Sequence, residues 1–226
     1  MVRSFFTGGS GGDFDHIVTK SVAMLGDARH SFDLATMALL TDADANTVSQ
    51  DVRDTDQRIN LAEQELRSEL VVHVAVKGTA DIGSVLGFTL LLKKIERVGD
   101  QAKNILDLAE HGVSLADVPE TATLLAERQV LSAFFNEASE FLTASTPDHD
   151  AIDDYAERVN VAIGQYQARI DGYLTSERPG REVVPLAIYY RFLRRIAANL
   201  VGVVRTSVAP VPLIDYLEQG SVDTDD

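Results

Sequence analysis

Residues 88–109 read FTLLLKKIERVGDQAKNILDLA, and this stretch decides the fold class of the chain. Its apolar side chains recur every three or four positions, so they form one stripe along a helix. The stripe consists of Phe88, Leu91, Leu92, Ile95, Val98, Ala102, Ile105, Leu106 and Ala109. A stripe of this length predicts a long amphipathic helix that buries one face against other helices.

Periodicity of this kind and the placement of proline and glycine predict six long helices. All six prolines lie at or after residue 119, and several of them separate helix-favouring segments. Asp44, Ser114 and Asp148 are predicted N-terminal caps, and Gly112 and Gly180 are predicted helix stops. The predicted helices cover residues 13–41, 44–76, 79–111, 117–144, 148–175 and 182–208.

Six helices of this length imply antiparallel bundles, so the predicted fold class is all-α. The one β-branched run, Val71–Val76, continues a helical register, and we expect it to be buried helix. Arg58-Ile-Asn60 is echoed by Arg158-Val-Asn160, which indicates two pseudo-repeated three-helix bundles. We expect a flexible glycine-rich lead-in over residues 1–12, bundles over 13–112 and 113–212, and an acidic tail over 213–226.

Composition limits the partners and the compartment. The chain has no cysteine, which excludes disulfides, thiolate metal sites and cysteine nucleophiles. Its formal net charge of -15 repels nucleic-acid backbones and anionic membranes. No signal peptide is visible, and no run approaches the ~18 apolar residues that a membrane helix needs. We therefore expect a cytoplasmic protein that neither binds nucleic acid nor inserts into a membrane.

The sharpest chemical pattern is acidic. Glu96 and Asp100 lie four residues apart and share one helix face, and Asp56, Asn60 and Glu63 share a face of the preceding helix. All five side chains flank the apolar stripe, and together they offer the oxygen ligands that hard cations and iron take. Spacing alone leaves two interpretations open, a solvated acidic face or a metal site.

These two runs resemble the PhoU family. Residues 95–105, IERVGDQAKNI, are similar to a family signature that reads roughly E-R-I-G-D-x-A-x-N-I, and residues 56–63, DQRINLAE, resemble the matching second-helix pattern. The separation of the two runs, the helix count and the chain length also agree with the family. The specific motifs lie in the first half of the chain.

The resemblance implies a function as well as a fold. Proteins of the PhoU family are two pseudo-repeated three-helix bundles that regulate phosphate uptake without catalysing a reaction. They repress uptake when phosphate is ample, acting on the ATPase of a phosphate transporter and on a sensor histidine kinase. Several bind iron or divalent metals on an acidic surface, which here implies a site at Asp56, Asn60, Glu63, Glu96 and Asp100, with no organic cofactor. We also expect a homodimer.

The second half departs from the family pattern. Arg194 stands where the first half has Glu96, and Ala198 stands where it has Asp100. Because a fixed positive charge opposes cation binding, we expect no second metal cluster of this kind. We predict that Arg191, Arg194 and Arg195 pair with acids of the fifth helix or contact a partner.

Two alternatives to a phosphate regulator remain. A di-metal carboxylate oxidase would use Glu-x-x-His pairs inside the bundle, and none of the five histidines has a glutamate three positions before it. A metal-free helical interaction protein would share the fold but lack the metal site. The pairs Glu69/His73 and Asp107/His111 have metal-ligand spacing, yet we interpret these histidines as packed or capping residues.

Overall fold

The computed structural model describes residues 14–41, 43–146 and 148–206, and this part of the chain consists of helices joined by short connections. The helices are α2 (Asp15–Leu40), α3 (Ala45–Lys77), the short 3-10 helix η1 (Thr79–Asp81), α4 (Ile82–Glu110), α5 (Thr121–Thr143), α6 (His149–Leu174) and α7 (Gly180–Thr206). The six predicted long helices and the all-α class are confirmed. The predicted lead-in over 1–12 and the acidic tail over 213–226 lie outside the described residues.

Local turn chemistry sets several helix ends. Asp44 accepts a hydrogen bond from the backbone N–H of Asn46 at 2.9 Å, and Asp148 accepts one from Ala151 at 3.1 Å, as the predicted caps require. Gly112 ends α4 with a φ of 81°, a conformation that favours glycine.

Two predicted helix signals are wrong. Ser114 does not cap the fourth helix, because its hydroxyl accepts from Ala116 N–H within the linker and α5 begins later, at Thr121. Gly180 is not a stop, because α6 already ends at Leu174 and Gly180 is the first residue of α7.

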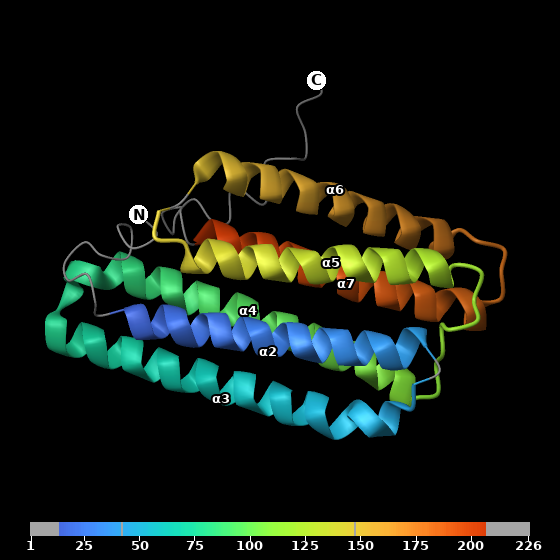
Figure 1. Ribbon diagram of the computed structural model, residues 1–226, viewed down its shortest axis with the longest axis horizontal. Helices are drawn as coiled ribbons and strands as arrows, with labels where there is room; N and C mark the ends of the chain where they lie inside the picture. The colour runs from blue at the N-terminus through green and yellow to red at the C-terminus, as the bar shows by residue number, and fades with distance from the viewer. Residues whose placement is uncertain (1–13, 42, 147, 207–226) are drawn as a thin grey trace.

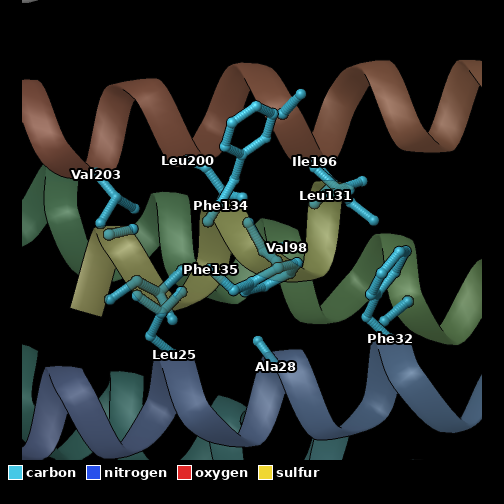
Figure 2. Close-up of a cluster of buried hydrophobic side chains, with 14 of the residues drawn as sticks. Leu25, Ala28, Phe32, Val98, Leu131, Phe134, Phe135, Ile196, Leu200 and Val203 are labelled. Atoms are coloured by element: carbon cyan, nitrogen blue, oxygen red, sulfur yellow. The ribbon is translucent and has the colours of Figure 1, made fainter. Parts of the chain in front are cut away.

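The helices form two three-helix bundles, as predicted. Helices α2, α3 and α4 pack on one another, and α7 packs on α5 and α6 (Figure 1). The α4–α7 and α2–α5 contacts join the two bundles, and one continuous hydrophobic core runs through both. Figure 2 shows this shared core, in which Phe134 and Phe135 of α5 lie among apolar side chains of α2, α4 and α7. The Phe32 and Phe135 rings stack with their centroids 5.6 Å apart.

Close approach of α3 to α4 depends on the glycine of the acidic motif. A Cβ atom at Gly99 would lie 3.0 Å from Ile59 Cδ1, which is tighter than ordinary van der Waals contact. Both residues are buried, so α4 meets α3 at this point without an intervening side chain from position 99. The motif glycine therefore fixes the spacing between the two helices that carry the acidic residues.

Residues Val71–Val76 are helical as predicted, but the prediction that they are buried is wrong. Val71, Val72 and Val76 are 68%, 60% and 74% exposed. Helix α2 begins short of the α3–α4 end of the bundle, so no third helix of the described part of the chain covers this last part of α3 (Figure 1). The buried stripe of α3 accordingly ends at Leu70.

No helix within the described ranges combines the length and the apolarity needed to cross a membrane.

Replacing Gly99 with valine tests the α3–α4 spacing. We expect Gly99→Val to lower the free energy of unfolding by ~1–3 kcal/mol, because the added side chain overpacks the contact with Ile59. Urea denaturation followed by circular dichroism measures the change.

Gly164→Val is the matched control, since Gly164 lies inside α6 with open space around its would-be Cβ. It should leave stability nearly unchanged or raise it slightly, because valine is the better helix former. Equal stability of the two variants would show that the glycine is not needed for packing.

Candidate functional site

The five predicted site residues lie on α3 and α4, the two helices whose contact carries the acidic motif. Asp56, Asn60 and Glu63 come from α3, and Glu96 and Asp100 come from α4. Burial differs among them, since Glu63 is only 6% exposed and the Asp100 side chain is 39% exposed. Asp56, Asn60, Glu96 and Asp100 are half-buried, as a flanking position requires. Glu63 instead lies within the buried stripe of α3, between Ile59 and Leu66, so the expectation is wrong for this residue.

Lys103 lies between two of the aspartates. Its ammonium donates to Asp56 Oδ2 at 2.9 Å and lies 3.7 Å from Asp100 Oδ1. The Asn60 amide approaches the same Asp56 oxygen, with an Nδ2–Oδ2 distance of 3.4 Å. Asp56, Asn60 and Asp100 are thus brought together around a lysine.

The environment of Lys103 favours its charged form. Burial pulls the pKa of its ammonium down, but the hydrogen bond to Asp56 and the nearby charges of Asp56, Asp100 and Asp107 outweigh burial, so the pKa is raised. A lysine whose folded-state pKa is raised stabilises the fold below its unfolded pKa, and that contribution is lost only as pH rises through the folded value. The ammonium is therefore a fixed positive charge at neutral pH.

The two glutamates have separate cations. Arg67 donates to Glu63 Oε1 at 3.0 Å, and Lys93 lies 2.7 Å from Glu96 Oε2. Glu96 Oε2 is shielded from solvent and makes no well-directed hydrogen bond, so Lys93 neutralises it by charge rather than by a directed bond.

The acidic face is therefore an ion-pair network in this structure. Among the described residues, no group of three or more histidine, aspartate or glutamate side chains could hold a metal ion. Hard cations take six or more oxygen ligands, and here Lys103, Lys93 and Arg67 take up the carboxylate oxygens instead. In this arrangement the donor set does not fit a metal cluster.

These basic partners were not among the predicted site residues, although helical spacing indicates most of them. Glu63 and Arg67 are four residues apart, and Lys93–Glu96 and Asp100–Lys103 are three apart, which are the separations at which helical neighbours meet. Only the bond from Lys103 to Asp56 depends on how two helices pack.

Neither spaced acid–histidine pair forms a site. His73 Nε2 contacts Asp81 at 2.9 Å, while Glu69 instead pairs with His16 at 2.5 Å and with Lys20 at 3.1 Å. The hydrogen bond from His16, followed by that from Lys20, lowers the pKa of the Glu69 carboxyl. The His73 ring also packs on Phe14, with the ring centroids 4.7 Å apart, so His73 is a packed residue as expected.

The second pair is separated in the same way. His111 Nδ1 contacts the backbone carbonyl of Asp107 at 2.6 Å at the end of α4. The Asp107 carboxylate instead accepts from Arg53 at 3.2 Å. His111 is therefore a capping residue.

The predicted partner-binding arginines lie on α7. Arg191 and Arg195 are exposed and Arg194 is half-buried. Within the described residues, none of them makes an ion pair, so the predicted pairing with acids of the fifth predicted helix, α6, is not seen. Arg158 on α6 instead pairs with Asp154 of its own helix.

Comparison with known proteins agrees with this geometry. A model of the PhoU domain matches residues 22–109, which span most of the first bundle. No curated protein matches the chain. The structure is similar to the crystal structure of PhoU from Pseudomonas aeruginosa, with a TM-score of 0.67 and 20% sequence identity over 92% of this chain and 98% of that chain. The resemblance carried by the first-half motifs is confirmed: residues 22–109 match the PhoU domain, and the described helices have the fold of the solved PhoU structure.

Proposed function

We propose that this protein is a non-enzymatic negative regulator of phosphate uptake and of phosphate-responsive signalling. The PhoU domain over residues 22–109 is the observation that carries the proposal. The acidic signature of that domain, Glu96 to Asp100, lies on the flank of α3 and α4, where another protein has access to part of it. Its partners would be the ATPase of a phosphate transporter, a sensor histidine kinase, or both, and the protein would act as a cytoplasmic homodimer.

The titratable groups support a regulatory rather than a catalytic role. The phenols with the most strongly raised pKa values, Tyr155, Tyr189 and Tyr190, are raised first of all by burial in the core. Tyr155 donates to the backbone carbonyl of Phe134 at 3.2 Å, and Tyr190 donates to Glu127 at 2.6 Å. These are packing contacts, whereas catalytic groups with shifted pKa values lie in clefts open to a substrate.

A di-metal oxidase is less consistent with the described residues. Such enzymes place carboxylates and histidines in the bundle interior. Here the interior is the hydrophobic core, and the acidic side chains other than the buried Glu63 lie at its flank. A metal-free interaction protein would differ from the proposed regulator in having no role in phosphate regulation, and the match to the PhoU domain favours the regulator.

At the acidic face of α3 and α4, we infer that Lys103 serves as a built-in counter-ion for Asp56 and Asp100. The ammonium occupies the position between two carboxylates where a bound cation would be most favourable. Any metal that binds Asp56, Asn60 and Asp100 must compete with the Lys103 ammonium, which belongs to the same helix as Asp100.

Lys103→Met tests the counter-ion role. The variant leaves Asp56 and Asp100 without their shared cation, so we expect a loss of ~1–3 kcal/mol in the free energy of unfolding. Added Mn²⁺ should raise the melting temperature of this variant more than that of the wild type. Calorimetry with and without Mn²⁺ measures both effects.

Lys20→Met is the control, because Lys20 forms an exposed ion pair with Glu69 and such pairs contribute less than ~1 kcal/mol. Its stability should not respond to Mn²⁺. If wild-type protein binds Mn²⁺ as tightly as Lys103→Met, the counter-ion role is wrong and the metal site implied by the family resemblance gains support.

Gene deletion tests the regulatory function itself. We expect the deletion strain to take up phosphate faster than the wild type and to express phosphate-starvation genes when phosphate is ample, because repression is lost. Uptake of radiolabelled phosphate and transcript levels measure the outcome, and complementation with the wild-type chain is the control. Unchanged uptake and expression at both high and low phosphate would reject the proposal.

A further inference from the structure

The exposed side of α7 carries three neighbouring arginines. Arg191 and Arg195 are exposed, Arg194 is half-buried, and none of the three makes an ion pair within residues 14–206 as described. Together they define the arginine face of α7. The three guanidinium groups lie within little more than one helical turn, so they repel one another unless an anion is near.

This concentration of uncompensated positive charge is unusual for the chain. The net charge of the chain is -15. Elsewhere in the described structure most basic side chains pair with carboxylates, as Arg53, Arg128 and Arg158 do. Beyond Glu182 in its first turn, helix α7 has no acid to do the same, because the sequence contains no aspartate or glutamate from Val183 to Ile214. The helical i, i+4 pairing found at Glu63 and Arg67 is therefore not available here.

The face also has an apolar component. Val184 lies two helical turns before Arg191 on the same line of the helix and is 52% exposed. Ala198, two turns after Arg191, is exposed as well. A segment that combines carboxylates with apolar side chains would complement such a surface better than a simple anion.

The chain itself contains such a segment. Residues 213–226 read LIDYLEQGSVDTDD, so Asp215 and Glu218 flank Tyr216 and Leu217, and further acids follow. Arg195 lies about 16 Å along the helix before Thr206, where the described part of α7 ends. Asp215 follows Thr206 by nine residues, a length of chain that can span up to ~30 Å. The acids are therefore within reach of the arginines of their own helix.

We propose that residues 213–226 bind in cis to the arginine face of α7. Each exposed ion pair contributes less than ~1 kcal/mol, so a single pair would not hold the segment. Several pairs formed by a tethered segment act together, because the tether keeps the local concentration of carboxylates at about the millimolar level. The contact is weak, sensitive to salt and open to competition from a carboxylate-rich region of another protein. This proposed contact does not depend on the proposed role in phosphate regulation.

A spin label tests this contact in the full chain. The protein has no cysteine, so Ser221→Cys creates a unique attachment site for a nitroxide. We expect the nitroxide to broaden the backbone amide signals around Arg191 to Arg195 more than those elsewhere on α7, as measured by two-dimensional NMR. The broadening should be lost at ~1 M salt, where the Debye length falls to about 3 Å.

Two charge variants assign the broadening to the proposed groups. Neutralising Asp215, Glu218, Asp223, Asp225 and Asp226 to their amides should remove it, and so should Arg191→Gln/Arg194→Gln/Arg195→Gln. The control Arg97→Gln/Arg181→Gln removes exposed arginines that also lack an ion pair in the described structure but lie outside the arginine face, and it should leave the broadening unchanged.

Two results would overturn the proposal. Broadening that persists in the triple arginine variant would show that the segment binds elsewhere or does not bind. Broadening that arises between spin-labelled unenriched chains and isotope-enriched unlabelled chains would show that the segment binds a second copy instead of its own helix.

Discussion

Helix α4 is the constraint on which the rest of the structure depends, because it packs against α2, α3 and α7 and so belongs to the cores of both bundles. Two glycines at its contacts allow this. Gly99 lies against Ile59 of α3, and Gly202 of α7 leaves the space that the Lys94 side chain occupies, because a Cβ there would lie 2.6 Å from Lys94 Cδ. The lysine is nearly buried, so its aliphatic stem replaces a side chain that α7 does not supply. The contact of α4 with α3 is therefore set by a glycine of α4 itself, and its contact with α7 by a glycine of α7 that accommodates a lysine of α4.

The two halves of the molecule also differ in charge at corresponding positions. In the first bundle, Glu63, Glu96 and Asp56 each lie beside a basic side chain that neutralises a partly buried carboxylate. Removing one member of such a pair costs more than the pair contributes, since it leaves a desolvated charge. In the second bundle, Arg191, Arg194 and Arg195 have no such partners in the described structure. The fold repeats, but the electrostatic role of the surface does not.

Most of the fold could be predicted from local sequence, and the exceptions share one physical cause. Phe88, Val98 and the rest of the α4 stripe, with the caps Asp44 and Asp148, specify helices by periodicity and hydrogen bonding within a few residues. The exposure of Val71–Val76 could not be found in this way, because it depends on where α2 begins relative to α3. The acidic site divides in the same way. The half-buried positions of Asp56 and Asp100 could be predicted from helical spacing, whereas the bond from Lys103 to Asp56 depends on the packing of two helices.

The exposed end of α3 has a consequence for how the chain misfolds. Residues 71–76 read VVHVAV, a segment of high β-propensity that contains no aspartate, glutamate, lysine or arginine. Segments of this composition stack into cross-β fibrils. While α3 is intact, its backbone groups bond within the helix and are not available to another chain. Few buried contacts hold this end, so it opens at a lower free energy than the centre of the bundle. Fraying of the last turns of α3, without global unfolding, is therefore the route by which this protein would begin to aggregate.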